Sequence, residues 1–114
     1  MSAITTHVLD LTSGRPASGV AVALSARGED GRWSEIARGV TDADGRLRDL
    51  LPAGQPLDPG IYALGFESAA YFHGRGLDTF YHEVVVSFRV DVAAAHHHVP
   101  LLLGPFGYST YRGS

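Results

Sequence analysis

Hydrophobic and polar residues alternate along much of this chain with the period of two that is typical of β-strands. The clearest run spans residues 84–92, where Val84, Val86, Phe88, Val90 and Val92 share one face. This pattern predicts a half-buried antiparallel strand. Alternating or apolar runs predict six further strands, at residues 4–11, 20–24, 32–40, 61–66, 96–103 and 107–112.

Turn-forming residues separate these runs. Clusters of Gly, Pro, Asp and Ser at residues 13–16, 29–31, 42–45 and 58–60 favour turns, and the last two strands would pair through Gly104-Pro105. Residues 67–73 predict one or two helical turns. Short strands at regular spacing with turns between them predict a β-sandwich. We expect one domain over residues 1–114, whose strand order the alternation does not determine.

Composition narrows the class of protein. The 114 residues are 45% hydrophobic and 18% charged, as in a folded globular domain. A net charge of −3 argues against a nucleic-acid partner. The sequence shows neither a signal peptide nor a stretch of transmembrane length, so we expect a cytoplasmic protein with no membrane partner.

The types of residue present also restrict the chemistry. There are no cysteines, which excludes a disulfide framework, a thiolate nucleophile and a cysteine zinc site. All nine basic residues are arginine, so a lysine Schiff base is excluded as well. Any catalytic base must therefore be His, Asp, Glu or Tyr.

The run His96-His97-His98 is the most conspicuous candidate site. On a strand, His96 and His98 would share one face and His97 would lie on the other. Three interpretations stay open. The imidazoles could simply be exposed at a polar strand start; they could bind zinc with a third ligand, although no acidic or cysteine partner is evident; or they could perform metal-free acid–base chemistry near pH 7.

Other polar candidates are ambiguous when taken one at a time. His7 would share a strand face with Thr5 and Leu9, where an isolated histidine is usually structural. Arg46 follows an Asp-Gly turn, where an arginine is usually solvated, and spacing does not choose between it and Arg48. Tyr111 and Arg112 suit a subunit contact as well as a site, since both residue types are enriched at interfaces.

The joint order of these residues resembles the transthyretin-related 5-hydroxyisourate hydrolases, which open a ring in urate breakdown. Four blocks carry the resemblance. They are His7-Val8-Leu9-Asp10 with Gly14-Arg15-Pro16-Ala17; Thr41-Asp42-Ala43-Asp44-Gly45-Arg46; Tyr71-Phe72 with Phe80-Tyr81; and His96-His97-His98-Val99-Pro100-Leu101-Leu102 continuing to Tyr111-Arg112-Gly113-Ser114. The last block is the most specific, because transthyretin itself lacks the Tyr-Arg-Gly-Ser ending.

The resemblance implies a fold and a site. The fold would be a mostly β, transthyretin-like (prealbumin-like) β-sandwich of two antiparallel sheets with one short helix. His7, Arg46 and His98 would be catalytic and would also bind substrate, together with Tyr111 and Ser114. No metal or organic cofactor would be required. The family match selects Arg46 over Arg48, and leaves open which histidine is the general base.

The resemblance also implies partners. The small-molecule substrate would be 5-hydroxyisourate, and the product 2-oxo-4-hydroxy-4-carboxy-5-ureidoimidazoline. The chain would form a homotetramer with its sites at the dimer–dimer interface. That assembly would explain why the C-terminal stretch is apolar, aromatic and free of Lys, Asp and Glu, since we expect it to be buried against neighbouring subunits.

The chain departs from the family pattern at three positions. His97 stands where Tyr is common, His82 where Pro is common, and Gly104 where Ser is usual. Position 97 should face away from His98, so we expect little effect on the chemistry. Two other functions remain as alternatives: a non-catalytic transthyretin-like protein that binds a small ligand, and a structural Ig-like sandwich. Neither requires the combination of His7, Arg46 and His98.

Overall fold

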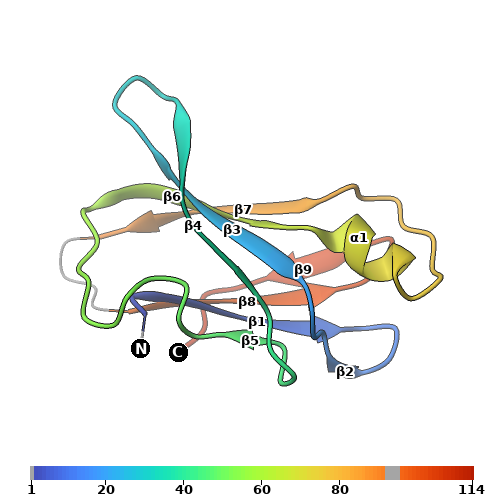
Figure 1. The fold of residues 1–114 in the computed structure, drawn as a ribbon. Coiled ribbons are helices and arrows are strands. Elements are labelled where there is room, and N and C mark those ends of the chain that lie inside the picture. The colour runs from blue at the N-terminus through green and yellow to red at the C-terminus, as the bar shows by residue number, and fades with distance from the viewer. Residues whose placement is uncertain (1, 92–95) are drawn as a thin grey trace.

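The computed structural model describes residues 2–91 and 96–114, which form two β-sheets packed face to face (Figure 1). One sheet has the strand order β2-β1-β8-β9, with β5 also paired to β1, and the other has the order β4-β3-β6-β7. The strands of the first sheet are β1 (Ile4–Asp10), β2 (Arg15–Pro16), β5 (Arg46–Leu47), β8 (His97–Leu103) and β9 (Tyr108–Thr110). Those of the second are β3 (Ala21–Arg27), β4 (Trp33–Val40), β6 (Gly60–Phe66) and β7 (Val84–Val90), and helix α1 (Ser68–His73) follows β6.

The predicted β-sandwich with one short helix is confirmed, and each predicted run contains a strand. The boundaries differ at several ends. Strand β1 stops at Asp10 because Leu11 begins a turn, β3 continues to Arg27, and β7 ends at Val90. Position 92, predicted to extend that last strand, lies outside the described residues. The two-residue strands β2 and β5 were not predicted, because two residues show no periodicity.

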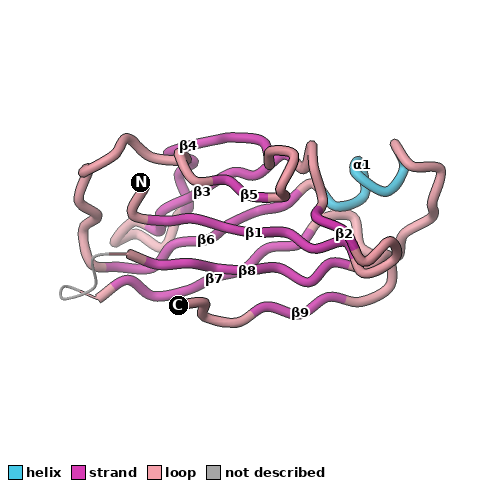
Figure 2. The backbone as a smooth tube through the Cα atoms, turned by 90° about the horizontal axis from the view of Figure 1, so that it is seen from below, coloured by secondary structure: helices cyan, strands magenta, loops and turns pink. Residues whose placement is uncertain are grey.

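The pairing of β1 with β8 brings the two ends of the chain together (Figure 2). These strands run parallel, in register from Ile4 opposite His97 to Asp10 opposite Leu103, whereas the other strand pairs are antiparallel. Residues in register across a sheet point to the same face. Since Thr5 pairs with His98, and His7 pairs with Arg46 of β5, three strands present polar side chains on one face.

The core lies between the sheets. Most inward positions of β1, β3, β6 and β8 are buried. The completely buried ones include Ile4, Val8, Leu24, Leu64, Phe66, Leu101 and Leu103. Burial of such side chains contributes roughly 2 kcal/mol each. The core therefore fixes the inward face of the β1–β8 pair and leaves its outward face for the polar residues.

A buried hydrogen bond joins α1 to β1. The hydroxyl of Tyr71 donates to Oδ2 of Asp10 over 2.7 Å, and Asp10 is only 1% exposed. Burial raises the pKa of Asp10, but hydrogen bonds from Thr12 and Tyr71 outweigh it and leave the pKa below its ordinary value. Burial and the neighbouring Asp10 carboxylate raise the pKa of Tyr71 to about 12. The pair therefore holds the helix to the sheet with a charged hydrogen bond.

Replacing Tyr71 with Phe should lower the free energy of unfolding by about 2 kcal/mol at pH 7, since a buried carboxylate loses a hydrogen bond. The folded-state pKa of Asp10 is depressed, so its contribution is complete above the unfolded value of about 3.9 and is lost as pH falls through the folded value. Urea denaturation should show that Tyr71→Phe lowers the free energy of unfolding less at pH 3 than at pH 7. Tyr62→Phe is the control, because the hydroxyl of Tyr62 donates to the neutral backbone carbonyl of Asp58, and its loss of stability should not depend on pH in this way. The same pH dependence in both variants would contradict a charged hydrogen bond between Tyr71 and Asp10.

The C-terminal stretch is exposed in the single chain. Phe106 is 70% exposed and Tyr111 is 57% exposed. The burial predicted for this stretch is against neighbouring subunits, which a single chain does not test, so it stays a prediction. Within the described residues, no helix is long and apolar enough to cross a membrane.

Candidate active site

A cavity of about 160 Å³ lies where β1, β5 and β8 meet. Figure 2 views this sheet from its outer side, with the C-terminal end of the chain beside β8. The residues lining the cavity are Thr5, Thr6, Arg46, Arg48, His96, His98 and Ser114. Among these lining residues there are cations and imidazoles but no Asp or Glu side chains, so the cavity suits an electron-rich polar ligand.

The Asp-Gly turn before β5 positions Arg46. The side-chain oxygen Oδ1 of Asp42 accepts hydrogen bonds from the backbone N–H groups of Asp44 and Arg46, over 2.9 and 3.0 Å. The turn also needs glycine at position 45, where φ is +72° and a Cβ atom would lie 2.5 Å from the carbonyl oxygen of Val8. The turn therefore holds the backbone of β5 close to that of β1 and places Arg46 opposite His7.

Replacing Gly45 with Ala should destabilise the fold and reduce activity together. The left-handed conformation costs an L-residue roughly 1–2 kcal/mol, and the contact with Val8 adds to that. Gly54 is a matched control, since its φ is +77° and a Cβ atom there would have no other atom within 4 Å. Urea denaturation should show a clearly larger loss for Gly45→Ala than for Gly54→Ala; equal losses would mean that the close approach to β1 is unimportant.

His98 is a half-buried titratable group of the cavity. Its Nδ1 lies 2.8 Å from the hydroxyl of Thr5. Burial lowers the pKa of His98, and the positive charge of Arg46 lowers it further, with smaller effects from His96 and His7. His98 is therefore neutral at pH 7 and can accept a proton.

The last residues of the chain lie against the His98 ring. The backbone N–H of Gly113 donates to the carbonyl oxygen of His98 over 2.8 Å. A Cβ atom on Gly113 would lie 2.5 Å from Cδ2 of His98 and 3.1 Å from Cγ of Pro100. Only a residue without a side chain fits this position, and Ser114 then lines the cavity.

Replacing Gly113 with Ala should lower kcat/KM about 100-fold while leaving the core intact, since a displacement of about 1 Å at a site can cost that much. The added methyl group would displace either the His98 ring or the chain end. Gly107→Ala is the control, because a Cβ atom at that position would have no other atom within 4 Å. Steady-state kinetics with the two variants test this; unchanged kcat/KM in Gly113→Ala would show that the fit against His98 is not needed.

The predicted site residues are brought together only in part. Arg46, His98 and Ser114 line one cavity, and His7 lies on the same face, where it affects the pKa of His98, without lining the cavity. Tyr111 lines a different cavity, of about 150 Å³, at the open edge between β7 and β9. His98 borders both cavities and is the link between them.

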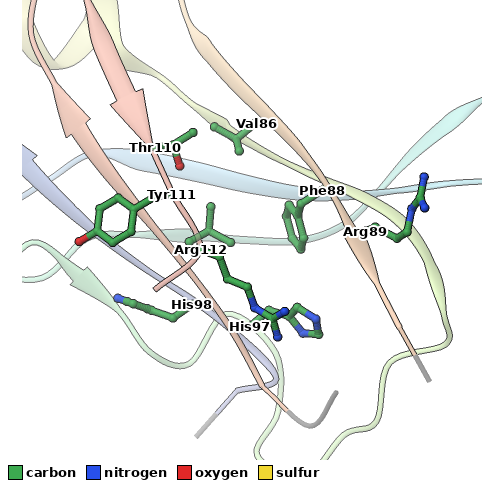
Figure 3. A pocket seen from close by; sticks show the side chains of 9 residues that line it. Val86, Phe88, Arg89, His97, His98, Thr110, Tyr111 and Arg112 are labelled. Atoms are coloured by element: carbon green, nitrogen blue, oxygen red, sulfur yellow. The ribbon is translucent and has the colours of Figure 1, made fainter. Parts of the chain in front are cut away.

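The edge cavity is shown in Figure 3, where Phe88, His97 and Arg112 lie close together. His97 points away from His98, as predicted, and is 6% exposed with its ring 6.4 Å from that of Phe88. Burial lowers the pKa of His97, and Arg112 lowers it further. The departure from Tyr at this position therefore affects the space between the sheets and leaves the cavity of Arg46 untouched.

Thr5 and His96 lie at the centre of the site, although neither was among the site residues that the resemblance implied. Thr5 lies within hydrogen-bond distance of both His96 and His98. The only sequence signal for Thr5 is its place two residues before His7, on the same strand face. Over the described part of the chain, no three His, Asp or Glu side chains are grouped so that they could hold a metal ion.

The architecture is shared with known structures. The chain superposes on sea bream transthyretin in complex with thyroxine with a TM-score of 0.91 and 34% identity, covering 98% of this chain and 95% of that one. It superposes on Klebsiella pneumoniae 5-hydroxyisourate hydrolase with a TM-score of 0.84 and 38% identity, covering 99% and 100% of the two chains. Fold and site therefore define a transthyretin-like β-sandwich.

Sequence comparison gives the family itself. The model of the HIUase/Transthyretin family matches residues 4–113. The 5-hydroxyisourate hydrolase of Caulobacter vibrioides is 49% identical over the full length of both proteins, and that of Mus musculus is 43% identical over 99% of this chain and 96% of the mouse protein. The chain belongs to the HIUase/transthyretin family, so the resemblance inferred from the four sequence blocks is confirmed.

Proposed function

We propose that this protein is a 5-hydroxyisourate hydrolase, an enzyme that opens the ring of 5-hydroxyisourate to give 2-oxo-4-hydroxy-4-carboxy-5-ureidoimidazoline. The observation that carries the proposal is the meeting of His98 and Arg46 with the chain end at Ser114 in one cavity. The comparisons agree with it, since relatives named 5-hydroxyisourate hydrolase are 42–49% identical to this chain in sequence comparison. In the structural comparison, the Klebsiella pneumoniae 5-hydroxyisourate hydrolase is 38% identical to this chain and sea bream transthyretin is 34% identical.

Hydrolysis needs a base, a stabiliser of negative charge and a proton for the leaving nitrogen. His98 removes a proton from water as the water oxygen bonds to the ring carbonyl carbon, because its lowered pKa keeps it neutral. Arg46 supplies a fixed positive charge to the oxyanion that develops on the carbonyl oxygen. The carbon–nitrogen bond then breaks, and the leaving nitrogen takes a proton from the His98 imidazolium or from His7.

Ser114 completes the proposed substrate site, and we propose that Tyr111 reaches the substrate from the neighbouring edge cavity, which His98 also borders. Ser114 lines the cavity and brings a side-chain hydroxyl to it. Tyr111 is 57% exposed, which leaves its ring free to stack on a flat heterocycle or to donate a hydrogen bond. The mechanism uses no metal or organic cofactor.

A homotetramer fits the exposed surface, and we propose that its sites lie at the dimer–dimer interface as they would in the family pattern. Phe80 is 75% exposed and Phe106 is 70% exposed, and they belong to neighbouring loops, because the backbone N–H of Phe80 donates to the carbonyl oxygen of Pro105. Apolar side chains gathered at one end of a small domain are typical of subunit contacts. We further propose that residues 1–114 act as one domain in the cytoplasm, with no nucleic-acid or membrane partner.

The alternative function, binding of a small ligand without catalysis, is less well supported. Sea bream transthyretin, solved in complex with thyroxine, shows that this sandwich can hold a small aromatic molecule. The cavity here is instead lined by imidazoles and guanidinium groups, which suit proton transfer and oxyanion stabilisation. A structural Ig-like sandwich would need neither.

An absorbance assay tests the proposed function. Uricase generates 5-hydroxyisourate from urate in the cuvette, and its decay is followed with this protein, with an equal mass of serum albumin, and with no protein added. The proposal predicts faster decay with this protein alone, in proportion to its concentration. Decay at the spontaneous rate in all three would reject the hydrolase and favour the binding protein.

A further inference from the structure

The hydroxyl of Thr5 lies between two imidazole rings of the site. Its Oγ1 is 2.8 Å from Nδ1 of His98 and 2.9 Å from Nε2 of His96. The two rings are stacked, with centroids 6.4 Å apart and planes 22° apart, and Thr5 is only 4% exposed although it points to the outer face of its sheet. This hydroxyl is therefore enclosed by the two rings.

The Thr5 hydroxyl has one hydrogen for the two contacts. Its oxygen can also accept, so at most one ring can accept from Thr5 and at least one ring must donate to it. Two arrangements use the hydroxyl hydrogen for one ring while the other ring donates. In the first arrangement, Nδ1–H of His98 donates to Thr5, which donates to Nε2 of His96. In the second, both bonds reverse and neutral His98 carries its proton on Nε2.

Only the first arrangement leaves a base at the reactive edge of His98. Its Nε2 is then unprotonated and can take the proton of water. When it has done so, both ring nitrogens carry hydrogen, and Nδ1–H still donates to Thr5 as before. The second arrangement would require the hydroxyl and both rings to reorganise before His98 could act, whereas catalytic sites gain from polar groups that are already oriented.

We propose that Thr5 and His96 are positioning residues that hold His98 in the tautomer with its proton on Nδ1. The mechanistic consequence rests on the proposed hydrolase function, while the tautomer itself does not. Thr5 fixes the ring through Nδ1, and His96 orients the Thr5 hydroxyl by accepting its hydrogen. His96 is exposed, so water can satisfy its other nitrogen. The nitrogen that a histidine protonates is commonly set by the hydrogen bond of the other one.

Nitrogen-15 NMR of histidine-labelled protein reads the tautomer of His98 directly. In the wild type, Nε2 of His98 should have the chemical shift of an unprotonated nitrogen at pH 7.5. Thr5→Ser keeps the hydroxyl and should retain that tautomer, whereas Thr5→Val keeps the shape and should move the proton to Nε2. His96→Phe should move it in the same direction. Thr79→Val, which removes a hydroxyl bonded to Pro105 outside the site, should have no effect.

Kinetics of the same variants separate positioning from structure. Thr5→Val should lower kcat about 10- to 100-fold with little change in KM, a range taken from groups that orient metal-bound histidines, and Thr5→Ser should restore it. A proton on Nε2 in the wild type, or a tautomer unchanged in Thr5→Val, overturns the inference even if the protein is an active hydrolase. Lack of hydrolysis together with the expected tautomer shifts would instead remove the proposed function and leave the role of Thr5 intact.

Discussion

Replacing His98 with Ala should lower kcat about 1,000-fold, because the variant loses the general base, a group whose contribution is typically 100- to 10,000-fold. Protein stability should change little, since His98 lies on the outer face of the sheet, away from the buried core. His73→Ala is the matched control: this histidine is exposed at the end of α1 and lines neither cavity described here.

The measurement for His98 is the initial rate of 5-hydroxyisourate decay at saturating substrate, with the uncatalysed rate subtracted. Added imidazole should partly restore activity in His98→Ala, because the truncated side chain leaves space for it. Turnover close to that of the wild type would exclude His98 as the base and leave His7 as the candidate.

Replacing Arg46 with Gln should lower kcat about 100- to 1,000-fold, the range seen when one stabilising group is removed from an oxyanion site. The substituted amide retains a hydrogen-bond donor but has no charge. The loss should therefore appear in kcat more than in KM, since the negative charge is present only in the transition state. Arg46→Lys should recover part of the loss, because a lysine keeps the charge without the planar guanidinium.

A second effect should accompany the change at Arg46. The charge of Arg46 helps to lower the pKa of His98, so the pKa of His98 should rise in Arg46→Gln. NMR titration of the His98 ring measures this shift. Arg32→Gln in the exposed β3–β4 turn is the control for removal of one positive charge. If the two variants behaved alike, the role assigned to Arg46 would be wrong.

Alternation in the sequence was sufficient to predict most of the fold. Strand β7 was predicted correctly over residues 84–90 because one face had to be apolar, and the same reasoning found the other long strands. It did not predict the parallel pairing of β1 with β8, because these segments lie at opposite ends of the chain. It also missed β5, whose two residues are held by the Asp42 turn rather than by a hydrophobic pattern.

The site was predicted less completely than the fold. Spacing alone did not distinguish Arg46 from Arg48, and the structure shows why, since both line the same cavity. Thr5 was not predicted as a site residue, because its role depends on hydrogen bonds to two imidazoles more than 90 positions away in the sequence. The family resemblance grouped Tyr111 with Ser114 in one substrate site, yet in the single chain the two residues border different cavities.

A crystal structure of the protein with urate, a flat ring that resembles the substrate and is not hydrolysed, would locate the active site directly. Urate should lie against His98, with Arg46 near a carbonyl oxygen and Ser114 at its edge. Urate bound only in the edge cavity between β7 and β9, away from Arg46, would show that the roles assigned to His98 and Arg46 are wrong.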